Sequence, residues 1–223
     1  MKKEFNLRQW SKDINFWCWF AATPICTLGL CLCTKSGLGI SMIGALPYII
    51  HKYMVQFFPW YSQGTSEYII QALVIIIAGI AIHQFKKKWV LSFLTAVIVG
   101  FCIDGWLLVL GGNGIVDGLV KRIIFFALGM VLTSAGISLY FRTRMPLQAY
   151  ELAVIEIADK YHWDNNKVKY VNDILYLVLS IILSLLLLHK LVGIGVGTII
   201  ITFLNAPLIA LFTKLFDKIG IPK

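Results

Sequence analysis

The sequence predicts an all-α integral membrane protein: a single membrane domain over residues 1–223, with six transmembrane helices arranged as two inverted three-helix repeats. Three observations predict this class. Hydrophobic residues make up 59% of the chain and charged residues only 14%, with a mean hydropathy of +0.81, which is more apolar surface than one soluble core of this size can bury. The apolar residues fall into six long stretches separated by short basic or glycine-rich links. The order of elements in the first half recurs in the second.

The six stretches set the expected spans. A helix needs about 20 apolar residues to cross about 30 Å of hydrocarbon. The stretches nearest this length are 14–34, 68–85, 89–110, 123–141, 174–188 and 191–212. A seventh apolar stretch, 40–60, is interrupted by Pro47, His51 and Lys52. We interpret it as a re-entrant or interfacial helix and not as a span.

Residues 146–161 are expected to form a second helix of this kind. Pro146 suits a first helical turn, and apolar residues follow at helical spacing. Glu156, Asp159 and Lys160 lie on the opposite side of that stripe, which predicts that they face water. An amphipathic helix flat on the cytoplasmic face is the simplest interpretation.

The distribution of Lys and Arg predicts the orientation. With six spans, 15 of the 20 basic residues fall before the first span, at 86–88, between 142 and 169, and after 213. The other five are Lys35, Lys52, Lys121, Arg122 and Lys190. Because basic residues concentrate in cytoplasmic loops, both termini are expected in the cytoplasm. The same bias explains the net charge of +9 without nucleic acid as a partner.

A weak internal repeat underlies the predicted inversion. The segment 29–32 resembles 136–139 at an offset of 107, and Tyr68, Gln71 and Lys88 correspond to residues 102 positions later. Each unit has three spans and one shorter helix, as repeat 1 over about 14–110 and repeat 2 over about 123–212. Since three spans is an odd number, consecutive units enter the membrane from opposite sides, as in many transporters. The alternative is a duplicated scaffold with no transport role.

Asp104 is the first candidate for a ligand site. It is an ionisable residue within an apolar span, and such residues are costly unless they are functional. At the offset of 102 it corresponds to Ala206, between Asn205 and Pro207. We expect Asp104, Asn205 and the carbonyls freed near Pro207 to line a polar site at mid-membrane depth. The alternative is that Asp104 lies near the outer interface and reaches water.

Glu151 and Arg142 are the second candidate set. Glu151 borders the apolar stripe of 146–161, from which it is placed to meet Arg142 or a substrate. No catalytic residues, cofactor site or metal site are expected: the four histidines are scattered, the five cysteines lie in apolar spans, and no nucleotide-binding motif occurs. The glycine-rich run 193–198 lacks the strand and the lysine of a phosphate loop, so close helix packing is expected there.

Several short motifs resemble those of the bacterial YczE/YitT-like membrane proteins. These motifs are 28–32 followed by 36–41, the third-span element 101–105, and Gly193-x-Gly195-x-Gly197-Thr198 followed by 205–209. The resemblance covers nearly the whole chain. It departs at 42–44, where the family has a proline and an acidic residue, and at Asn205-Ala206, where a glycine is usual before the proline. The resemblance implies a multispanning protein of the bacterial plasma membrane in a family that largely lacks an assigned activity.

These observations favour a transporter-like protein that handles a small solute at the interface between the repeats, with the lipid bilayer as its surroundings. Two alternatives stay open. One is an accessory membrane protein of a larger complex or biosynthetic cluster that transports nothing itself. The other is a substrate-capture subunit of a multi-subunit importer, with partner membrane subunits. An enzyme is not expected, because no catalytic set is present.

Overall fold

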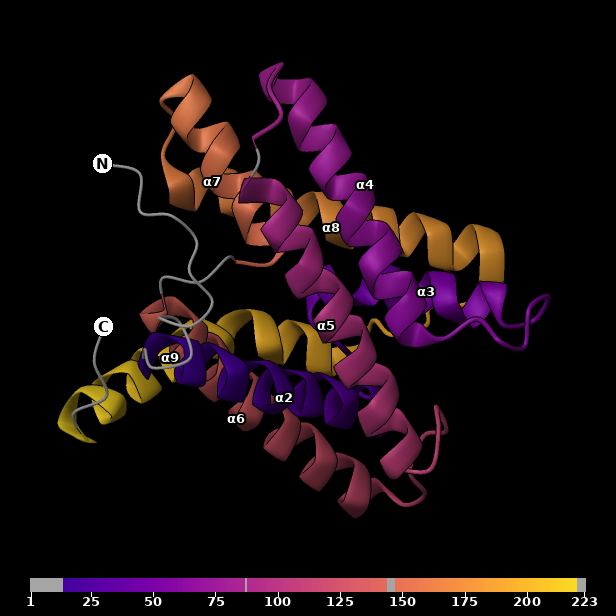
Figure 1. Cartoon of the computed structure of the whole chain (residues 1–223). Helices are drawn as coiled ribbons and strands as arrows, with labels where there is room; N and C mark the ends of the chain where they lie inside the picture. The colour runs from indigo at the N-terminus through magenta and orange to yellow at the C-terminus, as the bar shows by residue number, and fades with distance from the viewer. Residues whose placement is uncertain (1–13, 87, 144–146, 220–223) are drawn as a thin grey trace.

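The computed structural model describes residues 14–86, 88–143 and 147–219, and all regular structure in these residues is helical (Figure 1). Lys87, Pro146 and the basic residues before position 13, which entered the predictions above, lie outside the described residues. The described helices are α2 (Ile14–Ser36), α3 (Met42–Met54), α4 (Gln63–Ile82), α5 (Lys88–Val109), α6 (Leu119–Arg142), α7 (Ala149–Tyr161), α8 (Asn165–Leu188) and α9 (Val196–Ile219).

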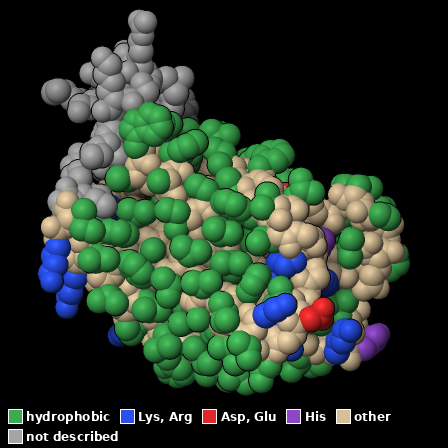
Figure 2. All heavy atoms as spheres, turned by 90° about the horizontal axis from the view of Figure 1, so that it is seen from below, with side chains coloured by type: hydrophobic (Ala, Val, Ile, Leu, Met, Phe, Trp, Pro, Cys, Tyr) green, Lys and Arg blue, Asp and Glu red, His purple; other side chains and the backbone are tan. Residues whose placement is uncertain are grey.

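Six of the described helices, all except α3 and α7, are long and apolar enough to cross a membrane. Figure 2 shows one face on which hydrophobic side chains cover the middle, while Lys and Arg gather at the left edge and in the right third. An apolar band between charged ends is the surface that a bilayer requires. The prediction of an all-helical protein with six helices that could span a membrane is confirmed for the described residues.

Two of these helices begin earlier than predicted because polar residues form their first turns. α4 begins at Gln63 rather than at residue 68, since the Ser62 hydroxyl accepts a hydrogen bond from the Thr65 N–H at 2.9 Å. α8 begins at Asn165 rather than at residue 174, since Asp164 accepts one from the Lys167 N–H at 3.0 Å. The extra turns place additional carboxylates, including Glu67 and Asp173, on span-length helices.

α3 and α7 are the two short helices, and Figure 1 shows them at opposite ends of α8. α7 does not extend away from the bundle. Its first residue, Ala149, donates its N–H to Gln71 of α4, and the hydroxyl of its last residue, Tyr161, donates to the Ala81 carbonyl. α7 therefore runs beside the second half of α4 over about 15 Å, at 1.5 Å of rise per residue.

This position corrects one prediction for α7. Asp159 and Lys160 are exposed as expected, but Glu156 is 2% exposed and forms an ion pair with Lys86. The side of α7 that carries Glu156 faces the link between α4 and α5 and does not face water. Helical periodicity predicted the apolar stripe correctly, but it gave no sign that a neighbouring element covers the opposite side.

The packing partners of the helices follow a paired pattern. α2 packs most extensively against α6; α3 packs on α8 and α7 on α4, while α2 packs on α5 and α6 on α9. α2 and α6 approach closely through glycines: a Cβ atom added at Gly129 would lie 2.7 Å from the Cys33 sulfur, and one at Gly136 would lie 2.6 Å from the Cys26 Cβ. The pattern breaks at two places: α4 packs tightly on α5 whereas α8 and α9 make little contact, and α5 packs on α7 whereas α9 and α3 make little contact.

Candidate functional site

Two links at the same end of the bundle meet to form the candidate site. One is 37–41, between α2 and α3, and the other is 189–195, between α8 and α9. The Ile40 N–H donates to the Gly193 carbonyl, and the Gly197 N–H donates to the Leu38 carbonyl, both at 2.9 Å. Gly39 has a φ of +143°, and a Cβ there would overlap the backbone nitrogen of Thr198, so only glycine allows the two links to come this close.

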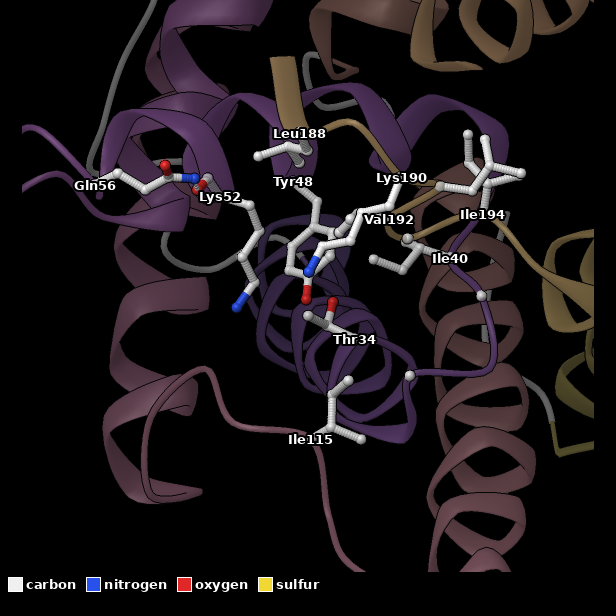
Figure 3. A pocket seen from close by; sticks show the side chains of 14 residues that line it. Thr34, Ile40, Tyr48, Lys52, Gln56, Ile115, Leu188, Lys190, Val192 and Ile194 are labelled. Atoms are coloured by element: carbon white, nitrogen blue, oxygen red, sulfur yellow. Dashed lines mark hydrogen bonds between the residues drawn. The ribbon is translucent and has the colours of Figure 1, made fainter. Parts of the chain in front are cut away.

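A cavity of about 450 Å³ lies beside these links (Figure 3). Its walls come from the end of α2, from α3, from the link after α5, and from the link between α8 and α9. The lining residues are Thr34, Gly37, Gly39, Ile40, Tyr48, Lys52, Gln56, Ile115, Leu188, Lys190, Leu191, Val192, Gly193 and Ile194. We call this cavity the basic pocket. Its volume lies in the usual range for small-molecule sites, about 300–1,000 Å³.

Two lysines give the basic pocket its charge. Figure 3 shows the two lysines on opposite sides of the Tyr48 ring, with Lys190 extending toward the Tyr48 hydroxyl. The Lys52 ammonium lies 5.3 Å from the centre of the Tyr48 ring and donates to the Asn113 carbonyl at 3.3 Å. Burial, and next the charge of Lys190, lower the pKa of Lys52. No acidic side chain occurs among the described residues that line the pocket, so these positive charges have no carboxylate there to offset them.

Two other basic residues at this end, Lys35 and Arg122, are engaged by backbone carbonyls. Lys35 donates to the Gly112 carbonyl at 2.8 Å, and Arg122 donates to the carbonyls of Ser36 and Gly37 at 2.6 and 2.9 Å. Because carbonyls at a helix C-terminus are unsatisfied and carry partial negative charge, the Arg122 bonds complete the end of α2. The Lys35 bond joins α2 to the link after α5. Lys52 and Lys190 are the basic residues that remain directed into the cavity.

Uncharged groups complete the pocket wall. Tyr48 is buried, and burial raises the pKa of its hydroxyl to about 12, which keeps it protonated and able to donate a hydrogen bond. Behind the wall, the buried His51 ring pairs with the Asn113 side chain at 2.9 Å between Nε2 and Nδ2. Burial, and then the charge of Lys52, lower the pKa of His51, so it is neutral and accepts from the amide. The pocket can therefore offer two cations and a hydroxyl donor to a small ligand.

Asp104 and Asn205 make contacts with different helices. Asp104 caps α4: its carboxylate accepts hydrogen bonds from the Gly64 N–H at 2.8 Å and the Ser62 hydroxyl at 2.6 Å. Asn205 accepts one from the Ser134 hydroxyl of α6 at 3.0 Å. Pro207 lies two residues further along α9. No described contact joins these residues into the polar site that the sequence predicted.

Arg142 and Glu151 are also placed apart. Arg142 is 3% exposed at the end of α6, where it pairs with Asp217 of α9 at 2.8 Å and stacks on Phe216 at 5.7 Å. It joins α6 to α9. Glu151 lies in the first turn of α7, where burial raises its pKa and the positive charge of Lys169 offsets part of that effect.

The sequence contained one signal for the basic pocket that its interpretation did not use. Four of the five basic residues assigned to the minority side, namely Lys35, Lys52, Arg122 and Lys190, gather at this pocket and its rim. These cations repel one another, and the bias of basic residues toward cytoplasmic loops does not explain why four of them gather on the opposite side. Tyr48 gave no such signal, because an aromatic residue on an apolar helix is usually part of the core.

Comparison with known proteins extends over almost the whole chain. Residues 14–214 match the model of a family described as "Family of unknown function (DUF6198)". The chain is also 27% identical over 197 residues to "Uncharacterized protein YyaS" of Bacillus subtilis (strain 168), an alignment that covers 87% of this chain and 90% of that protein. No solved structure matches. The chain belongs to the DUF6198 family.

Proposed function

We propose that the protein binds a small anionic solute in the basic pocket and moves it across the membrane. One observation carries the proposal: Lys52 and Lys190 border the same cavity of about 450 Å³, and no described acidic residue lines it. Two cations that repel each other in a partly buried site are stabilised by an anion between them. The Tyr48 hydroxyl supplies a neutral donor of the kind that phosphate, sulfate or carboxylate oxygens accept.

The location of the pocket supports transport by two repeats. Its walls combine the end of α2 and α3, from repeat 1, with residues 188–194 from repeat 2. Under the correspondence α2 with α6, α3 with α7, α4 with α8, and α5 with α9, the packing of α3 on α8 is equivalent to that of α7 on α4. We infer an inverted repeat from this equivalence and from the odd number of spans in each unit. The pocket lies at the ends of the helices, however, whereas the sequence analysis expected a site at the midplane.

The inverted repeat has a direct structural test. In an experimental structure in a lipid environment, residues 14–110 should superpose on 123–212 after a rotation of about 180° about an axis in the membrane plane. Unrelated helix arrangements in the two halves would refute the duplication. We also propose that the resemblance to YczE/YitT-like proteins reflects a shared fold, so those proteins should contain the same inverted repeat.

The orientation of the pocket is the second part of the proposal. The basic bias places both termini in the cytoplasm of a bacterium and the pocket on the outer side. In a cysteine-free background, a membrane-impermeant thiol reagent added outside should label a cysteine at exposed Lys121, close to the pocket, and should leave one at position 87 unmodified. Efficient external labelling at position 87 would reverse the orientation.

Binding of inorganic anions to the purified protein tests the function directly. Phosphate, sulfate and acetate should be titrated into protein in lipid nanodiscs, with heat of binding and thermal unfolding as readouts. We expect saturable binding of at least one anion, and we expect Lys52→Gln and Lys190→Gln to weaken it. Lys121→Gln, at an exposed lysine of the same end that does not line the pocket, is the matched control. Absence of saturable anion binding would refute the proposal.

Transport requires a separate experiment, because a capture subunit of an importer would have the same pocket. Proteoliposomes that contain this chain alone should accumulate the anion that binds, and Lys52→Gln should reduce the rate. Tight binding without uptake would assign the chain to substrate capture with partner subunits, which the largely exposed sides of α8 and α9 would accommodate. If the chain shows no anion binding and no uptake, the result would favour an accessory role.

A further inference from the structure

A buried hydrogen-bonded pair joins α4 to the start of α7. Gln71 is fully buried, and its Oε1 accepts the Ala149 N–H at 3.0 Å. Because a backbone N–H can only donate, this contact fixes the amide and turns its Nε2 toward Glu67. The Gln71 Nε2 then donates to the Glu67 Oε1 at 3.1 Å. The Glu67 carboxyl, 4% exposed, is therefore held by an amide and not by a cation.

A tyrosine hydroxyl lies next to this carboxyl. Tyr150 of α7 is 3% exposed, its ring meets Tyr176 edge-on at 5.5 Å, and it packs in one core cluster with Leu46 and Ile70. Burial, and next the nearby charge of Glu67, raise the pKa of Tyr150. Its buried hydroxyl interacts with the Glu67 carboxyl, and no other hydrogen-bond partner for it occurs among the described residues. It is thus a protonated donor beside a carboxyl that has room for one more bond.

No cation among the described residues compensates Glu67. The described titratable groups that interact with Glu67 are Cys26 of α2, Tyr150 and Glu151 of α7, and Tyr176 of α8, and none of them is a cation. Lys169 lies 4.0 Å from Asp173, and its charge acts on Glu151. A carboxylate away from water with no paired cation takes up a proton.

Other ligands fit these groups less well. In the described part of the chain, no three His, Cys, Asp or Glu side chains converge as a metal site. The side chains around Glu67 are packed in a core cluster, whereas a proton needs no cavity. We propose that Glu67 is a proton-binding site between the two halves of the protein. Its carboxyl is neutral in this arrangement and interacts with the Tyr150 hydroxyl, and on release of H⁺ to water the carboxylate is stabilised by a stronger hydrogen bond from Tyr150.

One helix connects this site to the basic pocket. α3 places Leu46 against Tyr150, while Tyr48 and Lys52 of the same helix line the pocket. A shift of α3 on anion binding would therefore act on the Tyr150–Glu67 contact. We infer that the proton on Glu67 moves together with the anion, which lowers the net charge carried through the membrane. This coupling rests on the proposed function; the proton site itself does not.

Infrared difference spectroscopy tests the proton site without any anion. Protein in nanodiscs should show a carbonyl band of protonated carboxylic acid near neutral pH, and one component of this band should disappear as the pH rises. Glu67→Gln should lose that component, and Asp159→Asn, at an exposed carboxylate of α7, should keep it. If Glu67→Gln does not fold, Tyr150→Phe should shift the frequency of the same component. An unchanged component in Glu67→Gln, or an unshifted one in Tyr150→Phe, would overturn the proposal.

The coupling has its own readout. Proteoliposomes that take up inorganic phosphate should become more acidic inside, as reported by a trapped pH-sensitive dye, and Glu67→Gln should bind phosphate without this acidification. Phosphate uptake with no pH change would refute the coupling and leave the anion site intact. A protonated Glu67 in a protein that binds no anion would instead refute the proposed function alone.

Discussion

Replacement of Lys52 by Met is the most informative perturbation of the basic pocket. The change removes the ammonium and keeps a side chain of similar length. A hydrogen bond between charged groups contributes about 1.5–3 kcal/mol, which is about a 10- to 150-fold change in Kd at 1.4 kcal/mol per tenfold. We therefore expect anion affinity to fall by one to two orders of magnitude.

The same substitution should leave the stability of the protein almost unchanged. The ammonium of Lys52 has a long bond of 3.3 Å to the Asn113 carbonyl and is repelled by Lys190. Its loss should therefore alter the free energy of unfolding by less than about 1 kcal/mol. Loss of affinity without loss of stability separates a ligand group from a structural one.

Calorimetric titration in nanodiscs gives the Kd, and thermal unfolding without anion gives the stability. Lys121→Gln is the control, because it removes one positive charge from the same end of the molecule without touching the pocket. An unchanged Kd in Lys52→Met would refute the reasoning. An equal loss in Lys121→Gln would also refute it, because it would show that only the overall charge matters.

Three further predictions follow from the described contacts. Burial and a neighbouring lysine lower the pKa of Lys52 from 10.5, so this ammonium loses its charge at a lower pH than an exposed lysine does. Anion affinity should therefore fall as the pH rises, whereas the Lys52→Arg variant should retain its affinity over the same pH range. Asp104→Asn should lower the unfolding free energy by about 1–2 kcal/mol, through the weakened cap of α4, without a change in anion Kd. Gly129→Val should destabilise the protein by about 1–3 kcal/mol in unfolding assays, since its Cβ would lie 2.7 Å from the Cys33 sulfur, whereas Gly105→Ala, with open space, should not.

The helices could be predicted because a membrane span is a local property of the sequence. Length and hydropathy located all six span-length helices and both shorter ones. The starts of α4 and α8 were missed, because apolar length alone set the predicted bounds, whereas the helices begin after the caps Ser62 and Asp164. The polar residues that follow Ser62, among them Glu67 and Gln71, are buried by other helices, and hydropathy does not report this.

The candidate site could not be predicted from the proposed repeat, because two residues at equivalent positions of a repeat need not lie close together in the structure. Asp104 and the region of Asn205 were paired through a sequence offset, yet residues related by a two-fold axis meet only where they lie close to that axis. α2 and α6 do meet, and Gly29 packs against Gly129 there. Asp104 and Asn205 lie on α5 and α9, which pack on α2 and α6 separately.

The proximity of Lys52 and Lys190 depends on backbone contacts between the two links, which composition does not encode. The bonds from Ile40 to Gly193 and from Gly197 to Leu38 use only N–H and C=O groups. Gly193 and Gly197 have to remain glycine, because a Cβ would lie 2.8 Å from the Tyr48 ring at the first and 2.6 Å from the Phe126 ring at the second. Lining side chains outside these bonds can change in descendants without a change in the distance between the two walls. Natural variation can therefore alter the charge and size of the lining residues separately from the frame that holds them. A relative as divergent as 27% identity can then retain the same backbone frame although the residues around the cavity differ in charge and size.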